Sequence, residues 1–95
     1  MSSFRSRRII AQFYRPDEDL FCCYCGTKVR RDVAFDHPEA VSLDHVLPLA
    51  KGGTNRPLNL VICCRDCNSY KGDKTIAEWL REAMRVAKER TNAPV

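Results

Sequence analysis

The stretch "CCYCG" (residues 22–26) carries a Cys-x-x-Cys pair, and "CRDC" (residues 64–67) carries a second one. Two residues between cysteines allow one tight turn to direct both sulfurs at a single ion, and two such turns complete a tetrahedron around Zn²⁺. Gly26 follows the first pair, where the chain must turn away at little steric cost. The spacing therefore predicts one closed, structural zinc site made of Cys22, Cys25, Cys64 and Cys67.

Two further cysteines, Cys23 and Cys63, lie one position outside these pairs. Cys63 ends an apolar run and is predicted to be a buried small hydrophobe. Cys23 could replace Cys22 only with a strained one-residue spacer to Cys25. A redox dithiol is the alternative use of such a pair, but it would leave the other pair idle.

Composition limits the class of protein. The chain has 95 residues, which predicts one domain with a modest core. Its formal net charge of +4 is only weak support for a nucleic-acid partner. The basic start "MSSFRSRRII" has no long apolar region behind it, and no stretch reaches the roughly 20 apolar residues of a membrane span. We therefore expect a cytoplasmic protein with no membrane partner, in a reducing compartment where paired cysteines bind metal.

Local patterns predict an α+β fold. An N-terminal helix should end before Pro16, and a short helix after the second cysteine pair should stop at Gly72. Two short strands are expected in "AVSLDHV" (40–46) and "LVIC" (60–63), joined by a loop rich in Gly, Pro and Asn. A capping box at Thr75 and Glu78 opens a C-terminal helix that runs to about Arg90. Its apolar face is expected to pack on the core.

Asp44 and His45 interrupt an apolar stretch, "SLDHVLPLAKG" (42–52). A carboxylate and an imidazole are costly to bury unless something binds them. Because the four thiolates already have a structural role, these two side chains need a different one. Asn68 follows the last zinc cysteine, so the zinc site should draw it toward the strand pair.

The segment from about Cys22 to Asp73 resembles the HNH endonucleases in their zinc-braced, four-cysteine form. Its pieces occur in the family's order: C-x-x-C-G, D-H-x-x-P-x-x-x-G-G, N-L, C-x-x-C-N and K-G. The resemblance implies a small ββα-metal fold, braced by the four-cysteine zinc site and flanked by N- and C-terminal helices. It also implies that residues 1–95 form a single HNH nuclease domain, with a core at about 20–74 and the C-terminal helix at about 75–90.

Carried over by position, the resemblance makes Asp44 a metal ligand, His45 the general base and Asn59 a brace for the loop that orients the histidine. Asn68 stands where the family has a second metal ligand. Carboxylate and amide oxygens favour hard cations, so Mg²⁺ or Mn²⁺ is the expected catalytic ion. An imidazole can accept a proton from water near neutral pH.

The implied activity is hydrolysis of DNA phosphodiester bonds, by nicking or by double-strand cleavage, to give 5′-phosphate and 3′-hydroxyl ends. Four basic residues near the site are candidates for phosphate contacts: Lys51, Arg65, Lys71 and Lys74. One monomer has one site, so cutting both strands requires a homodimer, a protein partner or sequential nicks. A bacterial or phage context suits a nuclease this small.

Two other interpretations use the same residues. "HPE" (37–39) followed by "CRDC" is similar to the zinc deaminases, with His37, Cys64 and Cys67 on a catalytic zinc and Glu39 moving protons. That interpretation leaves Cys22 and Cys25 without a role. The stronger rival is a non-catalytic zinc module that binds nucleic acid or protein, which would need neither Asp44 nor His45.

Overall fold

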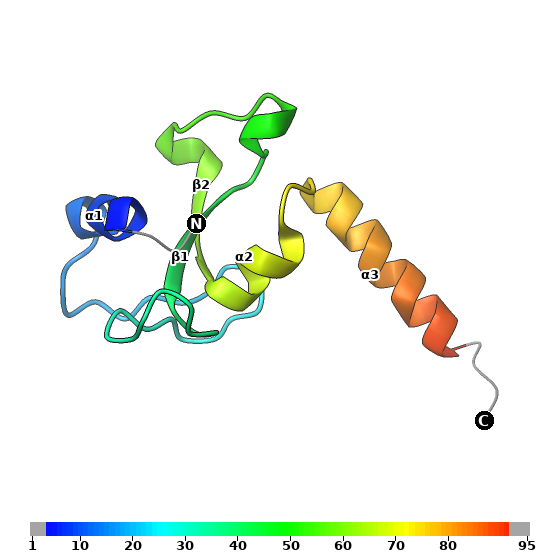
Figure 1. Cartoon of the computed structure of the whole chain (residues 1–95), viewed down its shortest axis with the longest axis horizontal. Helices are drawn as coiled ribbons and strands as arrows, with labels where there is room; N and C mark the ends of the chain where they lie inside the picture. Colours follow the sequence, from blue (N-terminus) through cyan, green and yellow to red (C-terminus); the bar gives the residue numbers. More distant parts are fainter. Residues whose placement is uncertain (1–3, 92–95) are drawn as a thin grey trace.

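The residues that the structure describes form three helices and a two-stranded antiparallel sheet (Figure 1). The structure is a computed structural model that describes residues 4–91. The elements follow the chain in this order: α1 (Phe4–Phe13), β1 (Val41–His45), 3₁₀ turns at Leu49–Lys51 and Pro57–Asn59, β2 (Leu60–Cys64), α2 (Arg65–Lys71) and α3 (Ile76–Thr91). The predicted α+β class and both flanking helices are confirmed.

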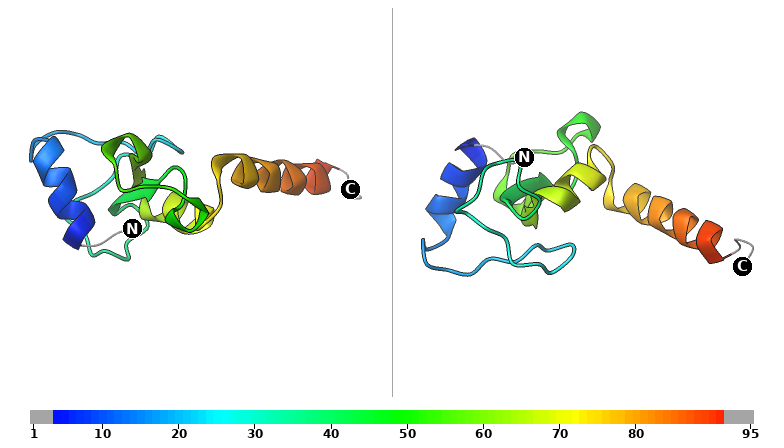
Figure 2. Two further views of the ribbon diagram at one scale, coloured as in Figure 1. Left: turned by 90° about the horizontal axis from the view of Figure 1, so that it is seen from above. Right: turned by 60° about the horizontal axis from the view of Figure 1, so that its bottom comes forward.

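Strands β1 and β2 pair so that Val41 lies opposite Cys64 and His45 lies opposite Leu60. Helix α2 begins directly after β2, and the Sγ of Cys64 caps it by accepting a hydrogen bond from the backbone N–H of Cys67 at 3.4 Å. Because no linker separates β2 from α2, the helix folds back beside the strand pair, as Figure 2 shows. The result is a β-β-α unit with the end of β1 next to α2.

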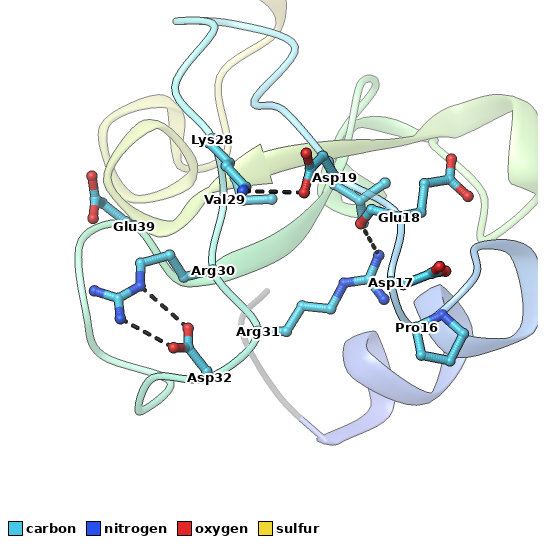
Figure 3. A pocket seen from close by; sticks show the side chains of 11 residues that line it. Pro16, Asp17, Glu18, Asp19, Lys28, Val29, Arg30, Arg31, Asp32 and Glu39 are labelled. Atoms are coloured by element: carbon cyan, nitrogen blue, oxygen red, sulfur yellow. Dashed lines mark hydrogen bonds and ion pairs between the residues drawn. The ribbon is translucent and has the colours of Figure 1, made fainter.

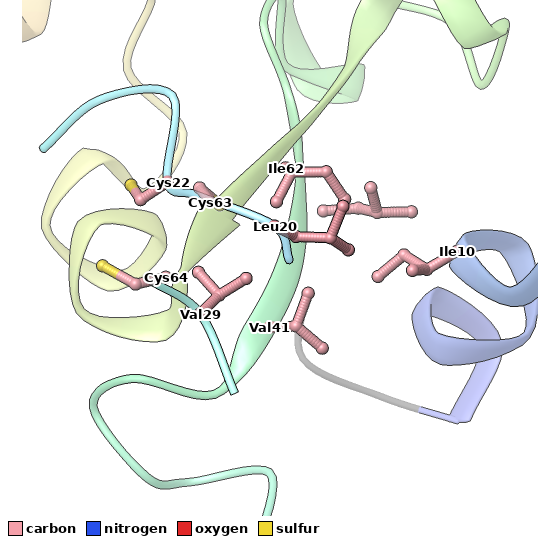
Figure 4. Packing of buried hydrophobic residues seen from close by; sticks show 9 residues of the cluster. Ile10, Leu20, Cys22, Val29, Val41, Ile62, Cys63 and Cys64 are labelled. Atoms are coloured by element: carbon pink, nitrogen blue, oxygen red, sulfur yellow. The ribbon is translucent and has the colours of Figure 1, made fainter. Parts of the chain in front are cut away.

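The core is small and lies between α1, the sheet and the first cysteine pair (Figure 4). Ile10 of α1 points toward the sheet, where it meets the strand residues Val41 and Ile62. Cys63 is fully buried, as its apolar run predicted. Apolar burial thus extends from α1 to the edge of the four-cysteine site.

The segment between α1 and β1 is irregular, with isolated bridges at Phe21–Lys28 and Arg30–Ala40. Arg7 of α1 attaches to this segment, because its guanidinium donates to the carbonyl of Val33 at 2.8 Å and lies 4.3 Å from the centre of the Phe35 ring. These contacts hold α1 against the rest of the fold. They give Arg7 a structural role.

Helix α3 forms where the sequence predicts it, but it does not pack on the core. The capping box is present: the N–H of Glu78 donates to Thr75 Oγ1 and the N–H of Thr75 donates to Glu78 Oε1, both at 3.1 Å. The helix then extends away from the other elements (Figures 1 and 2), and Leu80 and Met84 are 58% and 62% exposed. The radius of gyration, 14.9 Å, accordingly exceeds the roughly 12 Å of a compact chain of this length.

The contacts of α3 explain this difference. Its first turn is held by an ion pair between Lys51 and Glu78 and by an edge-to-face contact between Trp79 and Tyr24, with ring centres 5.1 Å apart. These contacts fix where the helix starts but leave its later turns beyond the reach of the sheet. An apolar helix face indicates that the helix can pack against another surface, but the pattern does not say which surface that is. No helix within residues 4–91 is long and apolar enough to cross a membrane.

The position of α3 predicts a contrast between two core-type substitutions. Ile10→Ala should lower the free energy of unfolding by about 2–5 kcal/mol, because it leaves a cavity among buried side chains. Leu80→Ala should change it by less than about 0.5 kcal/mol, because the side chain is exposed. Urea titration of both variants measures this. Equal losses would mean that α3 packs on the core after all.

Candidate functional site

The two Cys-x-x-Cys turns bring Cys22, Cys25, Cys64 and Cys67 into one cluster, with all ligand atoms within 4.8 Å of one another. The sulfurs of Cys25 and Cys64 are 3.8 Å apart. A tetrahedral site with Zn–S bonds of about 2.3 Å requires sulfurs separated by about 3.8 Å, so the cluster has the dimensions of a zinc site. Such a cluster could hold a metal such as zinc.

Electrostatics inside the cluster also favour a cation. Burial raises the pKa of the Cys22 thiol, but backbone N–H groups of Cys25, Cys64 and Tyr24 outweigh it and lower that pKa to about 7. Burial and the neighbouring thiols raise the pKa of Cys67. The fold therefore supplies hydrogen-bond donors that stabilise one thiolate, whereas several neighbouring thiolates would repel one another. A bound divalent cation would neutralise that repulsion.

The deaminase interpretation does not fit this cluster. Within residues 4–91, the four cysteines are the one group of His, Cys, Asp and Glu side chains close enough together to share an ion, and His37 is not part of it. His37 instead accepts a hydrogen bond from the N–H of Glu39 at 3.0 Å in the preceding loop. Because Cys22 and Cys25 complete the tetrahedron, a His37–Cys64–Cys67 zinc site is wrong for this fold.

A hollow of about 320 Å³ between β1 and α2 brings together three of the predicted site residues. Asp44 and His45, at the end of β1, line it together with Asn68 of α2. Successive residues of a strand point to opposite faces, and here Asp44 is buried whereas His45 is only partly covered. The end of β1 nevertheless presents both to the same hollow.

Asp44 is held by two donors on one oxygen. Its Oδ2 lies 2.9 Å from Lys71 Nζ and accepts a hydrogen bond from the hydroxyl of Tyr24. Burial, followed by the hydrogen bond to Asp44, raises the pKa of Tyr24, so its hydroxyl keeps the proton that it donates. The carboxylate is 4% exposed and sits beside the hollow with its Oδ2 fully engaged.

Lys71 corrects one prediction, because we expected it among the surface residues that contact phosphate. It is fully buried, and its Nζ also donates to the carbonyl oxygen of His45 at 3.0 Å. The signal for this was present in the sequence: Cys64, Cys67, Asn68 and Lys71 recur at the spacing of one helix face. A face that carries zinc ligands points inward, and Lys71 lies on it.

Asn68 has one end of its amide engaged. Its Nδ2 donates to Ser42 Oγ at 2.7 Å and to the Leu43 carbonyl at 3.4 Å. Because the NH₂ group is fixed on β1, the carbonyl oxygen is the atom that remains for a cation. The donor set of the hollow is therefore oxygen from Asp44 and Asn68, which fits Mg²⁺ or Mn²⁺ better than a soft metal.

The loop after β1 holds His45 through a residue that sequence reasoning missed. His45 Nε2 lies 2.7 Å from Oδ1 of Asn55. Asn59 closes the loop, because its side chain accepts from Leu47 N–H at 2.9 Å and donates to the carbonyls of Leu47 and Thr54 at 3.0 and 2.8 Å. The chain passes so close to itself that a Cβ on Gly53 would lie 1.8 Å from the Leu47 carbonyl oxygen.

The remaining basic candidates lie outside the interior. Lys51 pairs with Glu78 and lowers the pKa of that carboxyl to about 2, and Lys74 lies 3.2 Å from Glu82. Arg65 opens α2 with a partly covered side chain. Surface ion pairs such as Lys51–Glu78 and Lys74–Glu82 add little to overall stability, because water screens them.

A second hollow, shown in Figure 3, contains none of the predicted site residues. Its charges neutralise one another, with Lys28 3.1 Å from Asp19 and Arg30 3.1 Å from Asp32. Arg31 donates to the carbonyl of Glu18 at 2.9 Å. Its lining also contains no histidine, so it lacks the base that the predicted chemistry needs.

The cluster geometry predicts that only ligand cysteines control metal retention. Cys64→Ser should release bound zinc and lower the melting temperature, because metal binding and folding are coupled. Cys23→Ser is the matched control, because Cys23 is an exposed neighbour outside the cluster. Metal analysis and thermal melts in parallel check this. Loss of zinc from Cys23→Ser with retention in Cys64→Ser would overturn the ligand assignment.

Comparisons with known proteins identify the family of this chain. The family profile described as HNH endonuclease matches residues 22–84. A CRISPR-associated endonuclease Cas9 from Corynebacterium diphtheriae is 38% identical over 61 residues, which cover 63% of this chain and 5% of that protein. No solved structure matches. The matched region contains both cysteine pairs and the hollow beside them, and the chain belongs to the HNH endonuclease family.

Proposed function

We propose that this chain is a metal-dependent endonuclease that hydrolyses DNA phosphodiester bonds in the hollow between β1 and α2. The observation that carries the proposal is that Asp44, His45 and Asn68 line one hollow. Residues 1–95 form the nuclease domain in this proposal, with a core at about 20–74. The four cysteines hold a structural Zn²⁺, which leaves no position open for catalysis.

The free oxygens of Asp44 and Asn68 would hold one Mg²⁺ or Mn²⁺. When bound, that cation supplies positive charge for the phosphate and for the departing 3′-oxygen. The chain's own contribution is to fix both ligands in advance. Asp44 is fixed through its other oxygen, and Asn68 through its NH₂ group on β1.

His45 acts as the general base and accepts a proton from the attacking water. Because Asn55 Oδ1 is an acceptor, its contact with Nε2 selects the tautomer in which Nε2 carries the proton. The lone pair then belongs to Nδ1, which is the atom that takes the proton. Asn59 supports this by holding the loop on which Asn55 lies.

Phosphate binding is assigned to the three basic residues that lie outside the interior, Lys51, Arg65 and Lys74, and not to the buried Lys71. Charge-based contacts of this kind make binding fall as salt concentration rises. DNA as substrate and a bacterial cytoplasmic setting are part of this proposal, and the family match and the bacterial Cas9 relative support them. Cleavage of both strands would need a second copy or a protein partner, because each chain offers one site.

A plasmid-nicking assay tests the proposal. Wild-type protein should nick supercoiled DNA with Mg²⁺ or Mn²⁺ and stop when a chelator is added. His45→Ala should lose about 10²- to 10⁴-fold in rate, the usual contribution of a general base, and Asp44→Ala should lose activity while keeping zinc. His37→Ala is the matched control, because His37 is the other of the two histidines. Inactivity of the wild type with every divalent ion would favour the non-catalytic zinc module.

Substitution of Asn55 tests whether this residue selects the tautomer of His45. Asn55→Ala should lower kcat by about 10-fold or more with little change in KM, because the imidazole loses the acceptor that selects its tautomer. Asn55→Asp should retain most of the rate, because it keeps an acceptor oxygen in place. Long-range ¹H–¹⁵N NMR of the His45 ring reports the tautomer directly. An unchanged ring spectrum in Asn55→Ala would contradict this role.

A further inference from the structure

Tyr24 connects the four-cysteine site to the carboxylate of Asp44. It lies between the first two ligand cysteines, and its backbone N–H donates to Cys22 Sγ at 3.4 Å. The adjacent Cys23 N–H donates to the carbonyl of Ile62 at 2.9 Å, which ties this turn to β2. The hydroxyl at the far end of the same residue donates to Asp44 Oδ2. One side chain therefore spans from the sulfur cluster to the hollow.

The second donor to that oxygen comes from another element. Lys71 lies in the last turn of α2, with its Nζ 2.9 Å from Asp44 Oδ2 and 3.0 Å from the carbonyl oxygen of His45. A single donor would anchor Oδ2 but leave the carboxylate free to rotate around that point. Two donors from different elements fix the plane of the group. Oδ1 is then the oxygen left for an ion.

We propose that Tyr24 is a positioning residue that orients Asp44 for the catalytic cation and so couples the structural metal to the catalytic one. The inference rests on the proposed function, because it requires Asp44 to be a metal ligand. The zinc-bound turn sets the position of the Tyr24 ring, and the hydroxyl sets the orientation of the carboxylate. Residues that orient metal-ligating carboxylates in this way govern metal affinity.

The hydroxyl is the informative group, because the ring has a separate structural contact. The Tyr24 ring packs edge-to-face on Trp79 at 5.1 Å between centres, with an angle of 85° between the ring planes. A phenylalanine at this position keeps that packing and the backbone bond to Cys22. It removes only the donor to Asp44. Tyr24→Phe therefore separates orientation of the carboxylate from stability of the cysteine turn.

The experiment measures Mn²⁺ binding by EPR in the absence of DNA, on full-length protein saturated with zinc. Tyr24→Phe should bind Mn²⁺ about 10- to 100-fold more weakly than wild type, with unchanged zinc content and melting temperature. Tyr70→Phe is the matched control, because Tyr70 is 71% exposed and also loses only a hydroxyl. Equal affinity in Tyr24→Phe and wild type would overturn the inference. Tighter Mn²⁺ binding in Tyr24→Phe would also overturn the inference. It would mean that the Tyr24 hydroxyl only draws negative charge from the Asp44 carboxylate and does not orient it.

A second variant covers the case in which Tyr24→Phe loses zinc or unfolds. Tyr24→4-aminophenylalanine keeps a donor at the same place and should bind Mn²⁺ within about threefold of wild type. An affinity as low as that of Asp44→Ala, in a folded and zinc-loaded protein, would contradict the inference.

Wild type and Asp44→Ala separate this inference from the function on which it rests. If Asp44→Ala binds Mn²⁺ as well as wild type, the cation site itself is wrong and the inference falls with it. If Asp44→Ala loses Mn²⁺ while Tyr24→Phe matches wild type, only the role of Tyr24 is wrong. Weakened binding in both variants, with Tyr70→Phe unchanged, supports the inference.

Discussion

The convergence of four cysteine sulfurs is the constraint on which the rest of this fold depends. A two-stranded sheet with five residues in each strand is marginal in water, and a chain this short buries too little apolar surface to compensate. The cluster joins the turn at residues 22–25 to the start of α2, with all ligand atoms within 4.8 Å. Because α2 follows β2 without a linker, fixing its first turn also fixes the rest of the helix against the end of β1.

From that fixed start, the helical repeat places the remaining site residues. Cys64 and Cys67 face the sulfur cluster, so Asn68 and Lys71, on the same face, must face β1. Asn68 reaches Ser42, and Lys71 reaches Asp44 and the backbone of His45. A single helix of seven residues thus carries structural ligands at one end and residues that organise the hollow along the rest of its inward face. The position of the sulfur cluster therefore determines, through α2, where Asn68 and Lys71 lie relative to the hollow.

The sequence predicted what short-range patterns control. Cys-x-x-Cys spacing, the capping box at Thr75 and the stop at Gly72 each depend on a few neighbouring residues, and all three appear in the structure. Contacts between distant segments were harder to predict. The apolar face of α3 did not reveal that the helix leaves the core, and the helix face shared by Lys71 and the cysteines did not reveal that Asp44 is its partner. Asn55 gave no signal at all, because its contact with His45 depends on how the loop closes.

The contribution of the buried Lys71–Asp44 pair to the stability of the fold does not explain why the pair is there. Taking both charges out of water costs several kcal/mol per ion, and their mutual attraction seldom recovers more than that. A small domain gains more from an apolar pair of similar volume. Charge at this position makes sense if Asp44 must remain oriented for a cation, because the carboxylate then needs buried donors on its other oxygen. Tyr24, from the first cysteine turn, and Lys71, from α2, both donate to Oδ2 of Asp44, so the fold satisfies that oxygen. In the proposed function the other oxygen, Oδ1, binds the cation.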